Sequence, residues 1–267
     1  MDNKLLFAKL QLEYRTVEQR MSQDNCIFLA RVGSQMYGTN TLNSDDDFVG
    51  IFIPDRKYVV GLKHIDQVEY RTNPTKSGKK NQVGDRDVTL YTLRKWVQLA
   101  LNNNPNIVEL FFVPENCILH TTSLWKKICE SKDSFLSLKL FHSFRGYAYA
   151  QRYKLELKSG NNTGRKDLIE KYGYDVKLAS HNIRLYLECI QLLKEQQITF
   201  PLPERNLVKQ IKDGKWSFDK FVEESNKLAD LCSSLYKESK LPYSPNYEEV
   251  DKLLIEVQDT FWEQFGK

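Results

Sequence analysis

The chain has 267 residues, 41% of them hydrophobic and 28% charged, which is the balance of an ordinary globular protein. This composition excludes a disordered or fibrous protein, and the longest apolar runs are far shorter than the roughly 20 residues of a membrane span. The net charge of +4 is too small to indicate a nucleic-acid binder by itself.

The cysteines and the N-terminus indicate a reducing compartment. Five cysteines are widely spaced and include no C-x-x-C pair, so neither a disulfide framework nor a zinc site is predicted. The first residues lack the basic stretch, apolar core and cleavage site of a secretory signal. We therefore expect a cytoplasmic protein with reduced thiols.

The N-terminal part combines helix and strand patterns. Apolar residues recur near helical spacing over 5–20, which predicts an amphipathic helix. The runs 26–32 and 48–53 are short, apolar and rich in β-formers, and turn residues bound both, so we expect two strands. Residues 93–101 again repeat apolar side chains at helical intervals. Asn104 followed by Pro105 predicts the capped start of a further short helix.

From residue 121 onward the periodicity is helical almost throughout. Six helices are predicted, over 123–130, 134–157, 165–195, 204–213, 217–239 and 247–265. A polar, glycine-containing stretch at 158–164 is the main break between them. The pattern predicts an α/β domain over residues 1–115 and an all-helical domain over residues 116–267.

Three consecutive aspartates open the second predicted strand. Strand residues two apart face the same side, so Asp45 and Asp47 can direct their carboxylates at one point while Asp46 points away. Two like charges so close repel, and a divalent cation with oxygen ligands such as Mg²⁺ is their usual stabiliser. An acidic, solvated turn is the alternative. An EF-hand is excluded, because Phe48 and Pro54 occupy the positions that need glycine and glutamate.

The turn that ends the first predicted strand has the composition of a phosphate cradle. Gly33 permits close approach, and Ser34 adds a hydroxyl donor. Backbone N–H groups are available there, because the chain enters a short helix. We therefore predict that Gly33 and Ser34 bind a phosphate oxygen.

A third carboxylate follows a long polar segment. Residues 72–84 have no apolar period and read as a loop, and residues 88–91 read as a strand. Asp87 immediately precedes this strand and is the predicted third carboxylate. Asp85, two residues earlier on the same face, is the alternative.

A donor cluster is predicted in the helical half. Lys177, His181 and Arg184 fall at i, i+4 and i+7, on one face of a helix. Such donors suit a triphosphate or its pyrophosphate leaving group. A solvated helix face with a half-buried histidine is the alternative.

These features together resemble a known signature. Gly33-Ser34, Gly38 and the segment SDDDFVGIFIP are similar to the motif of the DNA polymerase β superfamily of nucleotidyltransferases, in which a Gly-Ser turn precedes a D-x-D strand. The similarity is greatest to the stand-alone predicted nucleotidyltransferases of bacteria and their phages, and it extends over nearly the whole chain. It continues through a series of further residues: Asp87, Arg94, Asn104, Glu109, Gly146, Gln151, Tyr174, Lys177, His181, Arg184 and Trp216.

The resemblance implies an α+β fold, with a small mixed sheet and helices in the N-terminal domain. It implies two Mg²⁺ ions between a nucleoside triphosphate and the carboxylates of Asp45, Asp47 and Asp87. Lys177, His181 and Arg184 would bind the triphosphate. The expected reaction moves a nucleoside monophosphate to an acceptor hydroxyl and releases pyrophosphate. A catalytically silent nucleotide-binding or antitoxin-like module and a helical interaction protein are the alternatives.

The acceptor is an RNA end in our interpretation, with a protein or a small molecule as the alternatives. Between Lys139 and Lys177 there are nine Lys or Arg against four Asp or Glu. Aromatic and basic side chains interleave there: Phe141, Phe144, Arg145, Tyr147, Tyr149, Arg152, Tyr153 and Lys154. This mixture suits single strands, whose bases stack on rings. Use of those rings in the core is the competing interpretation.

Overall fold

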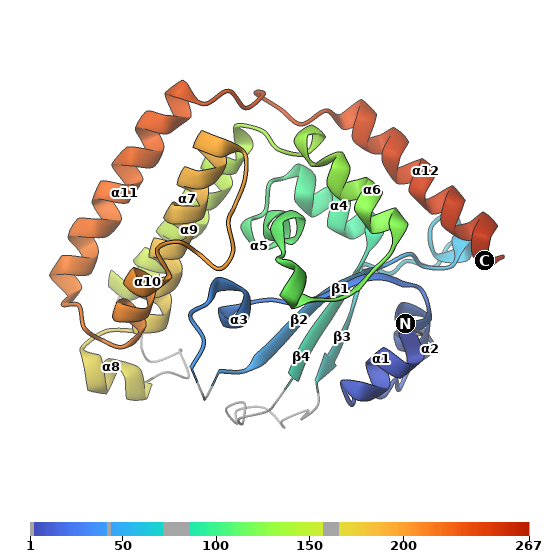
Figure 1. Ribbon diagram of the computed structural model, residues 1–267, viewed down its shortest axis with the longest axis horizontal. Helices are drawn as coiled ribbons and strands as arrows, with labels where there is room; N and C mark the ends of the chain where they lie inside the picture. Colours follow the sequence, from blue (N-terminus) through green and yellow to red (C-terminus); the bar gives the residue numbers. More distant parts are fainter. Residues whose placement is uncertain (1–2, 42–43, 72–85, 157–165, 267) are drawn as a thin grey trace. The chain divides into compact units, whose positions relative to one another are not determined.

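The computed structural model describes residues 3–41, 44–71, 86–156 and 166–266. The chain divides into two compact units, each formed by more than one segment (Figure 1). Unit 1 comprises residues 1–101, 113–135 and 246–267, and unit 2 comprises residues 102–112 and 136–245. Among the described residues, no helix is long and apolar enough to cross a membrane.

Unit 1 is built on a mixed five-stranded sheet of order β3-β4-β2-β1-β5. Its strands are β1 Cys26–Arg31, β2 Asp46–Phe52, β3 Gln67–Arg71, β4 Arg86–Thr92 and β5 Ile118–Thr121. Strands β2 and β4 pair in parallel, and the other pairs are antiparallel. The predicted mixed sheet is confirmed, and the edge strands β3 and β5 are additions to it.

Two helices cover one face of this sheet. Helix α1 (Asn3–Lys9) and helix α2 (Val17–Asp24) occupy the stretch that the sequence pattern assigned to a single helix. The chain breaks between them because Gln11 adopts a positive φ of 56° and Thr16 caps α2 by accepting from the Gln19 N–H. Their apolar side chains share a core cluster with the sheet, which includes Phe7, Met21, Leu29, Phe48, Phe52, Val88 and Leu90.

Aromatic side chains hold helices on the other face. Trp125 of α6 (Ser123–Glu130) stacks on Phe28 of β1 with ring centroids 4.3 Å apart. Trp96 of α4 (Leu93–Leu101) meets Trp125 edge to face at 5.0 Å. The last helix, α12 (Tyr247–Phe265), packs against α4 and α6, and the indole of Trp262 donates to the carbonyl of Pro54. Helix α12 therefore belongs to the sheet unit.

The described residues of unit 2 form helices and connecting turns without a strand, whereas the stretch 116–267 that the pattern assigned to helices also contains β5. The helices of unit 2 are α5 Pro105–Val108, α7 Lys139–Glu156, α8 Lys166–Tyr172, α9 Val176–Glu195, α10 Arg205–Lys212 and α11 Phe218–Glu238. Helix α9 is the most buried and packs against α7, α10 and α11. Asn182 joins three of them, because its amide donates to the carbonyl of Ala148 and accepts from the hydroxyl of Ser225.

Five short helical elements complete the described part of the fold. The four-residue helix α3 spans Ser34–Tyr37. Short 3-10 segments span Arg56–Tyr58, Glu109–Phe112, Glu115–Cys117 and Lys132–Ser134.

The predicted helix over 165–195 is two helices, α8 and α9. Asp175 accepts from the backbone N–H groups of Lys177 and Leu178 and therefore caps the start of α9.

The chain does not divide at one point near residue 115. Residues 102–112 belong to the helical unit, where the Asn103 side chain accepts from the backbone N–H and the hydroxyl of Ser137. Strand β5 and helix α12 return to the sheet unit, and the Asn246 N–H donates to the carbonyl of Ser134. Long-range pairing of this kind leaves no signal in a local pattern.

Gly50 yields a test of how tightly the sheet is packed. It lies between Leu29 and Leu90, and a Cβ there would be 2.7 Å from the carbonyl oxygen of Phe28 and 2.4 Å from Leu90 Cδ2. We expect Gly50→Ala to lower the free energy of unfolding by about 1–3 kcal/mol, measured by urea denaturation. Gly146→Ala is the matched control, because nothing lies within 4 Å of its Cβ position. That helical change is expected to stabilise by up to about 1 kcal/mol, and equal losses in both variants would contradict this account.

Candidate functional site

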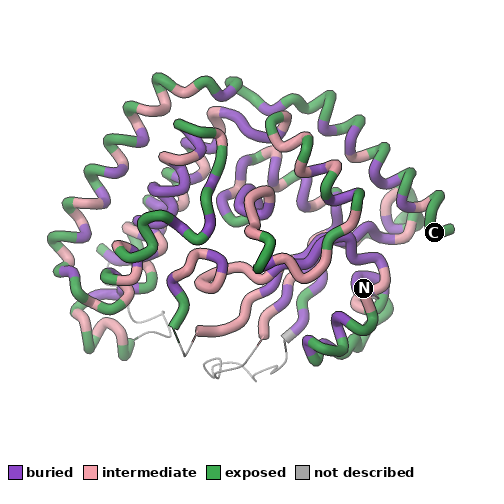
Figure 2. Tube along the Cα trace, in the orientation of Figure 1, coloured by how far each residue is buried: buried purple, intermediate pink, exposed green. Residues whose placement is uncertain are grey.

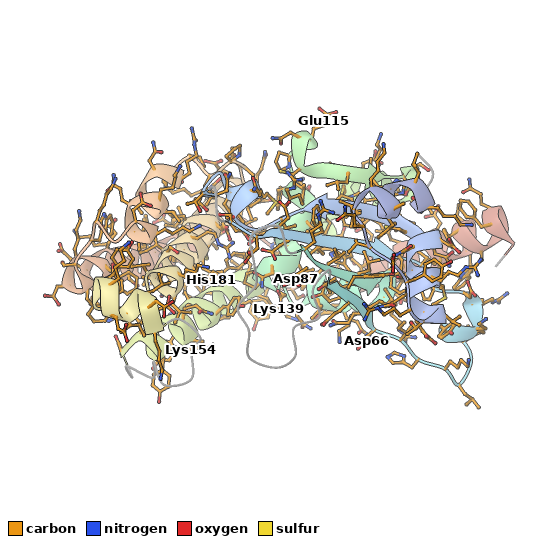
Figure 3. All side chains as sticks on the ribbon, turned by 90° about the horizontal axis from the view of Figure 1, so that it is seen from below. Asp66, Asp87, Glu115, Lys139, Lys154 and His181 are labelled. Carbon is orange, nitrogen blue, oxygen red and sulfur yellow. The ribbon has the colours of Figure 1, made fainter. Side chains whose placement is uncertain are left out.

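Two of the three predicted carboxylates come together at one end of the sheet. Asp47 of β2 is the direct register partner of Asp87 of β4. Parallel neighbours in register carry their side chains on the same face, about 4.8 Å apart. Both residues are partly exposed, and Figure 2 shows β2 and β4 less buried here than along their centres. Figure 3 labels Asp87 at this strand end.

The middle aspartate points away from that pair. Asp46 Oδ1 lies 3.5 Å from the guanidinium Nε of Arg31, which also covers the ring of Phe48 at 5.6 Å. Phe48 belongs to the core beneath α1 and α2, so Asp46 shares the opposite face of the sheet. Its negative charge is therefore balanced there and does not add to the charge at Asp47.

Asp45 is one residue outside the strand. It directly precedes β2 and is partly exposed, so strand alternation does not fix the direction of its side chain. In the described part of the chain, no three His, Cys, Asp or Glu side chains gather closely enough to hold a metal ion. The alternative carboxylate Asp85 lies outside the described residues.

Gly33 brings the backbone against the Asp47 carboxylate. It has a φ of 68°, in the left-handed region that favours glycine, and a Cβ there would lie 3.0 Å from Asp47 Oδ2. The preceding Val32 N–H donates to the Asp47 carbonyl at 2.9 Å, which fixes this approach. Helix α3 begins at Ser34, as the turn predicts. The carboxylate is thus kept clear of side chains on its Gly33 side.

This end of the sheet offers the donors that a hard cation prefers. Carboxylate oxygens such as those of Asp47 and Asp87 are typical Mg²⁺ ligands, and the Gly33 backbone lies against the Asp47 carboxylate with no side chain between them. Like charges in register repel at this separation, so a bound divalent cation would lower the free energy of the pair. The residues present therefore fit a magnesium site in donor type, with two of the three predicted carboxylates in register.

The predicted donor helix is α9 of unit 2. Lys177, its second residue, is exposed, and His181 is half-buried with its ring edge to face against Tyr147 at 5.2 Å. The three residues share a helix face, as their spacing predicts, but their exposure falls along it. Lys177 is therefore accessible to solvent and His181 is partly accessible, whereas Arg184 is buried.

Arg184 has a structural role in this arrangement. It is only 5% exposed, and its guanidinium donates to carboxylate oxygens of both Glu109 and Glu188, at 2.7 Å for Glu188. Burial raises the pKa of Glu188 well above its ordinary value, although Arg184 opposes that shift. A guanidinium committed to two buried carboxylates is not available to a phosphate, which corrects the expected role of Arg184.

Two residues of unit 2 were not identified from the sequence. Glu188 lies at i+4 from Arg184, the spacing of a helical ion pair, so the sequence spacing alone could have predicted this ion pair. Lys212, at the end of α10, is partly buried, and its pKa is lowered by that burial and by the nearby charge of Lys177. The proximity of Lys212 to Lys177 depends on how α9 and α10 pack, which the local pattern does not contain. Lys177 and Lys212 together concentrate positive charge near the start of α9.

Comparison with known proteins gives a family match over most of the chain. The model of RlaP, described as the RNA repair pathway DNA polymerase beta family, matches residues 8–255. An uncharacterized 38.9 kDa protein from the nrdC-mobD intergenic region of Enterobacteria phage T4 is 27% identical over 140 residues, which are 52% of this chain. The match spans 41% of the length of that phage protein.

A solved structure is also similar. It is a nucleotidyltransferase-like protein from Exiguobacterium sibiricum, with 9% identity and a TM-score of 0.31. The alignment covers 97% of this chain and 79% of that chain.

Gly33 should tolerate no side chain without disturbing Asp47. We expect Gly33→Ala to displace the Asp47 carboxylate and to cost roughly 1–3 kcal/mol of backbone strain, because of the left-handed φ and the 3.0 Å contact. The displacement is measured as weaker binding of Mn²⁺, followed by electron paramagnetic resonance. Gly173→Ala, also at a positive φ but with nothing within 4 Å, is the control for strain alone. Equal Mn²⁺ affinity in both variants would contradict the role given to Gly33.

Glu188 should make stability depend on pH. Its folded pKa is raised by burial, so the folded state holds this proton more tightly than the unfolded chain does. Stability is therefore lost as the pH rises above the ordinary carboxyl pKa towards the folded one. We expect Glu188→Gln, which cannot ionise, to gain stability relative to the wild type as the pH rises above the ordinary carboxyl range, measured by urea denaturation. The exposed Glu195→Gln on the same helix should follow the wild type, and a parallel pH profile for Glu188→Gln would refute the assignment.

Proposed function

Because the chain belongs to the RNA repair pathway DNA polymerase β family and is of the nucleotidyltransferase kind, we propose that it transfers a nucleoside monophosphate to an acceptor hydroxyl. The donor is a nucleoside triphosphate, and pyrophosphate is released. The observation that carries this proposal is the register of Asp47 and Asp87 at a partly exposed sheet end beside Gly33. Paired carboxylates next to a backbone turn are the requirement of metal-dependent nucleotidyl transfer.

Asp45, Asp47 and Asp87 would hold two Mg²⁺ ions. When bound, these ions stabilise the negative charge that develops on the attacking and leaving oxygens of an in-line displacement. The backbone N–H groups of the Gly33-Ser34 turn and the Ser34 hydroxyl would donate to a phosphate oxygen. Arg31 neutralises Asp46 on the opposite face, so the cation-binding charge is confined to one face of the sheet.

Unit 2 has a concentration of positive charge of its own. Lys177 is exposed at the start of α9, and Lys212 lies close enough for the two charges to repel. Such a concentration of like charge favours an anion, because a bound phosphate relieves the repulsion. Within unit 2, Lys177 and His181 are the proposed phosphate contacts, with Lys212 as an addition, and Arg184 is left to its buried carboxylates.

The proposed acceptor is an RNA end. Two observations support RNA over a protein or a small molecule: the RNA repair pathway in the description of the family, and the excess of cations between Lys139 and Lys177. Electrostatic attraction of this kind serves phosphate backbones without regard to sequence.

Substitution of the aspartates tests the proposed reaction. We expect Asp45→Ala, Asp47→Ala and Asp87→Ala each to lower transfer by at least about 10³-fold, because the metal ligands carry the largest local charge of the site. Transfer is measured with each α-³²P-labelled nucleoside triphosphate and total RNA, in the presence of Mg²⁺. The unfolding midpoints should stay close to the wild type, since all three side chains lie outside the core. Asp46→Ala is the matched control and should keep most of the activity, because Asp46 faces Arg31.

Other outcomes of these substitutions would change the proposed site or the proposed reaction. Near-normal transfer by Asp87→Ala, together with loss in Asp85→Ala, would move the third carboxylate to Asp85. Equal loss in Asp46→Ala and Asp47→Ala would argue against a face-specific metal site. Nucleotide binding without transfer to any acceptor, in the wild type, would favour the silent nucleotide-binding module.

A further inference from the structure

Helix α7 of unit 2 presents two large aromatic side chains to solvent. Tyr149 is 64% exposed and Tyr153 is 49% exposed. Arg145, Tyr149 and Tyr153 recur at intervals of four residues, so they line one face of the helix. We call these three residues, with Arg152 and Lys154 beside them, the α7 tyrosine face.

The fold separates the aromatic side chains of α7 by role. Phe141 and Phe144 are buried in the core, and Tyr147 is half-buried against the ring of His181. Packing therefore accounts for these three and leaves Tyr149 and Tyr153 unexplained. The rings of Tyr149 and Tyr153 lie nearly parallel, with centroids 6.2 Å apart and an interplanar angle of 19°. Two flat π faces are thus held side by side in solvent.

Helix α7 has a net positive charge. Helix α7 carries four cations, at Lys139, Arg145, Arg152 and Lys154, and one carboxylate, at Glu156. Arg152 is engaged by that carboxylate at 2.7 Å and by Asn226 of α11. Arg145 and Lys154 are exposed on either side of the tyrosines, and Figure 3 labels Lys154. Gly146 is exposed beside Arg145, and in the described part of the chain nothing lies within 4 Å of its Cβ position.

We propose that the α7 tyrosine face binds a single-stranded segment of nucleic acid. Bases stack on Tyr149 and Tyr153, and the phosphates between them are attracted by Arg145 and Lys154. A single strand fits this surface better than a duplex, because only unpaired bases offer their faces for stacking. An acidic peptide would satisfy the cations but would leave the parallel rings without a matching group.

This inference deepens the proposed function, on which it rests for the choice of RNA as acceptor. It names the form of the RNA and the surface that holds it. The surface lies wholly within unit 2, so the inference needs neither the nucleotide nor the metal. Its test can therefore be run with both absent, which separates it from the test of transfer.

Fluorescence anisotropy with a labelled single-stranded RNA of about 12 nucleotides, without nucleoside triphosphate and with EDTA, measures this binding. We expect the double variant Tyr149→Ala/Tyr153→Ala to bind at least about tenfold more weakly than the wild type, because the stacking of a base on each tyrosine ring is lost. The double variant Tyr149→Phe/Tyr153→Phe should bind within about twofold of the wild type, since it keeps both rings. Tyr243→Ala is the matched control, as Tyr243 is another exposed tyrosine of unit 2, at 84%, outside α7.

Several results would overturn the proposal. These are absence of wild-type binding at about 50 mM salt, equal affinity of the wild type and the double alanine variant, and equal affinity for the fully paired duplex of the same sequence. Displacement of the RNA by polyglutamate as effectively as by unlabelled RNA would favour an acidic peptide instead. Tyrosine-dependent binding without transfer to RNA would support the α7 tyrosine face while contradicting the proposed acceptor.

Discussion

The parallel pairing of β2 with β4 is the constraint on which the candidate site depends. It sets Asp47 opposite Asp87, at the end of the sheet where both strands begin and are partly exposed. A shift of the register by one residue would turn one of these side chains to the other face. The neighbouring β1 pairs with β2 in antiparallel orientation, so the end of β1 delivers Gly33 to the same place.

The packing of unit 1 protects this register. Helices α1 and α2 cover one face of the sheet and fill a core that includes Phe48 and Val88, the residues next to the two aspartates. Gly50 lets β1 and β4 approach β2 from either side without a side chain between Leu29 and Leu90. Burial of the strand centres thus holds two like-charged side chains together at the strand starts, where solvent or a cation can offset their repulsion.

Carboxylates have a structural role in unit 2, because there they are buried and paired with Arg184. Glu109, Arg184 and Glu188 are almost wholly buried, and a missing partner there would leave an uncompensated charge in the core. Asp47 and Asp87 are instead partly exposed, at the start of their strands. Exposure also distinguishes the aromatic residues of α7, where Phe144 packs and Tyr149 faces solvent.

Much of this arrangement was predictable from local patterns. The strand that starts at the aspartates, the short helix after Gly33 and the helices α6 and α12 follow from periodicity and capping residues. The α+β class and the pairing of a Gly-Ser turn with D-x-D followed from the family resemblance. The predictions failed where distant segments decide the outcome. Edge strands β3 and β5 exist through pairing with β4 and β1, and Arg184 is buried because Glu109 arrives from another part of the chain.

The central claim is that the sheet end at Asp47 and Asp87 binds a nucleotide through a divalent cation. Isothermal titration calorimetry with a nonhydrolysable nucleoside triphosphate analogue, with and without Mg²⁺, measures this most directly. The account predicts saturable binding with Mg²⁺ that is lost on chelation and is lost in Asp47→Ala. Binding of equal affinity without the metal, or no binding in its presence, would contradict it.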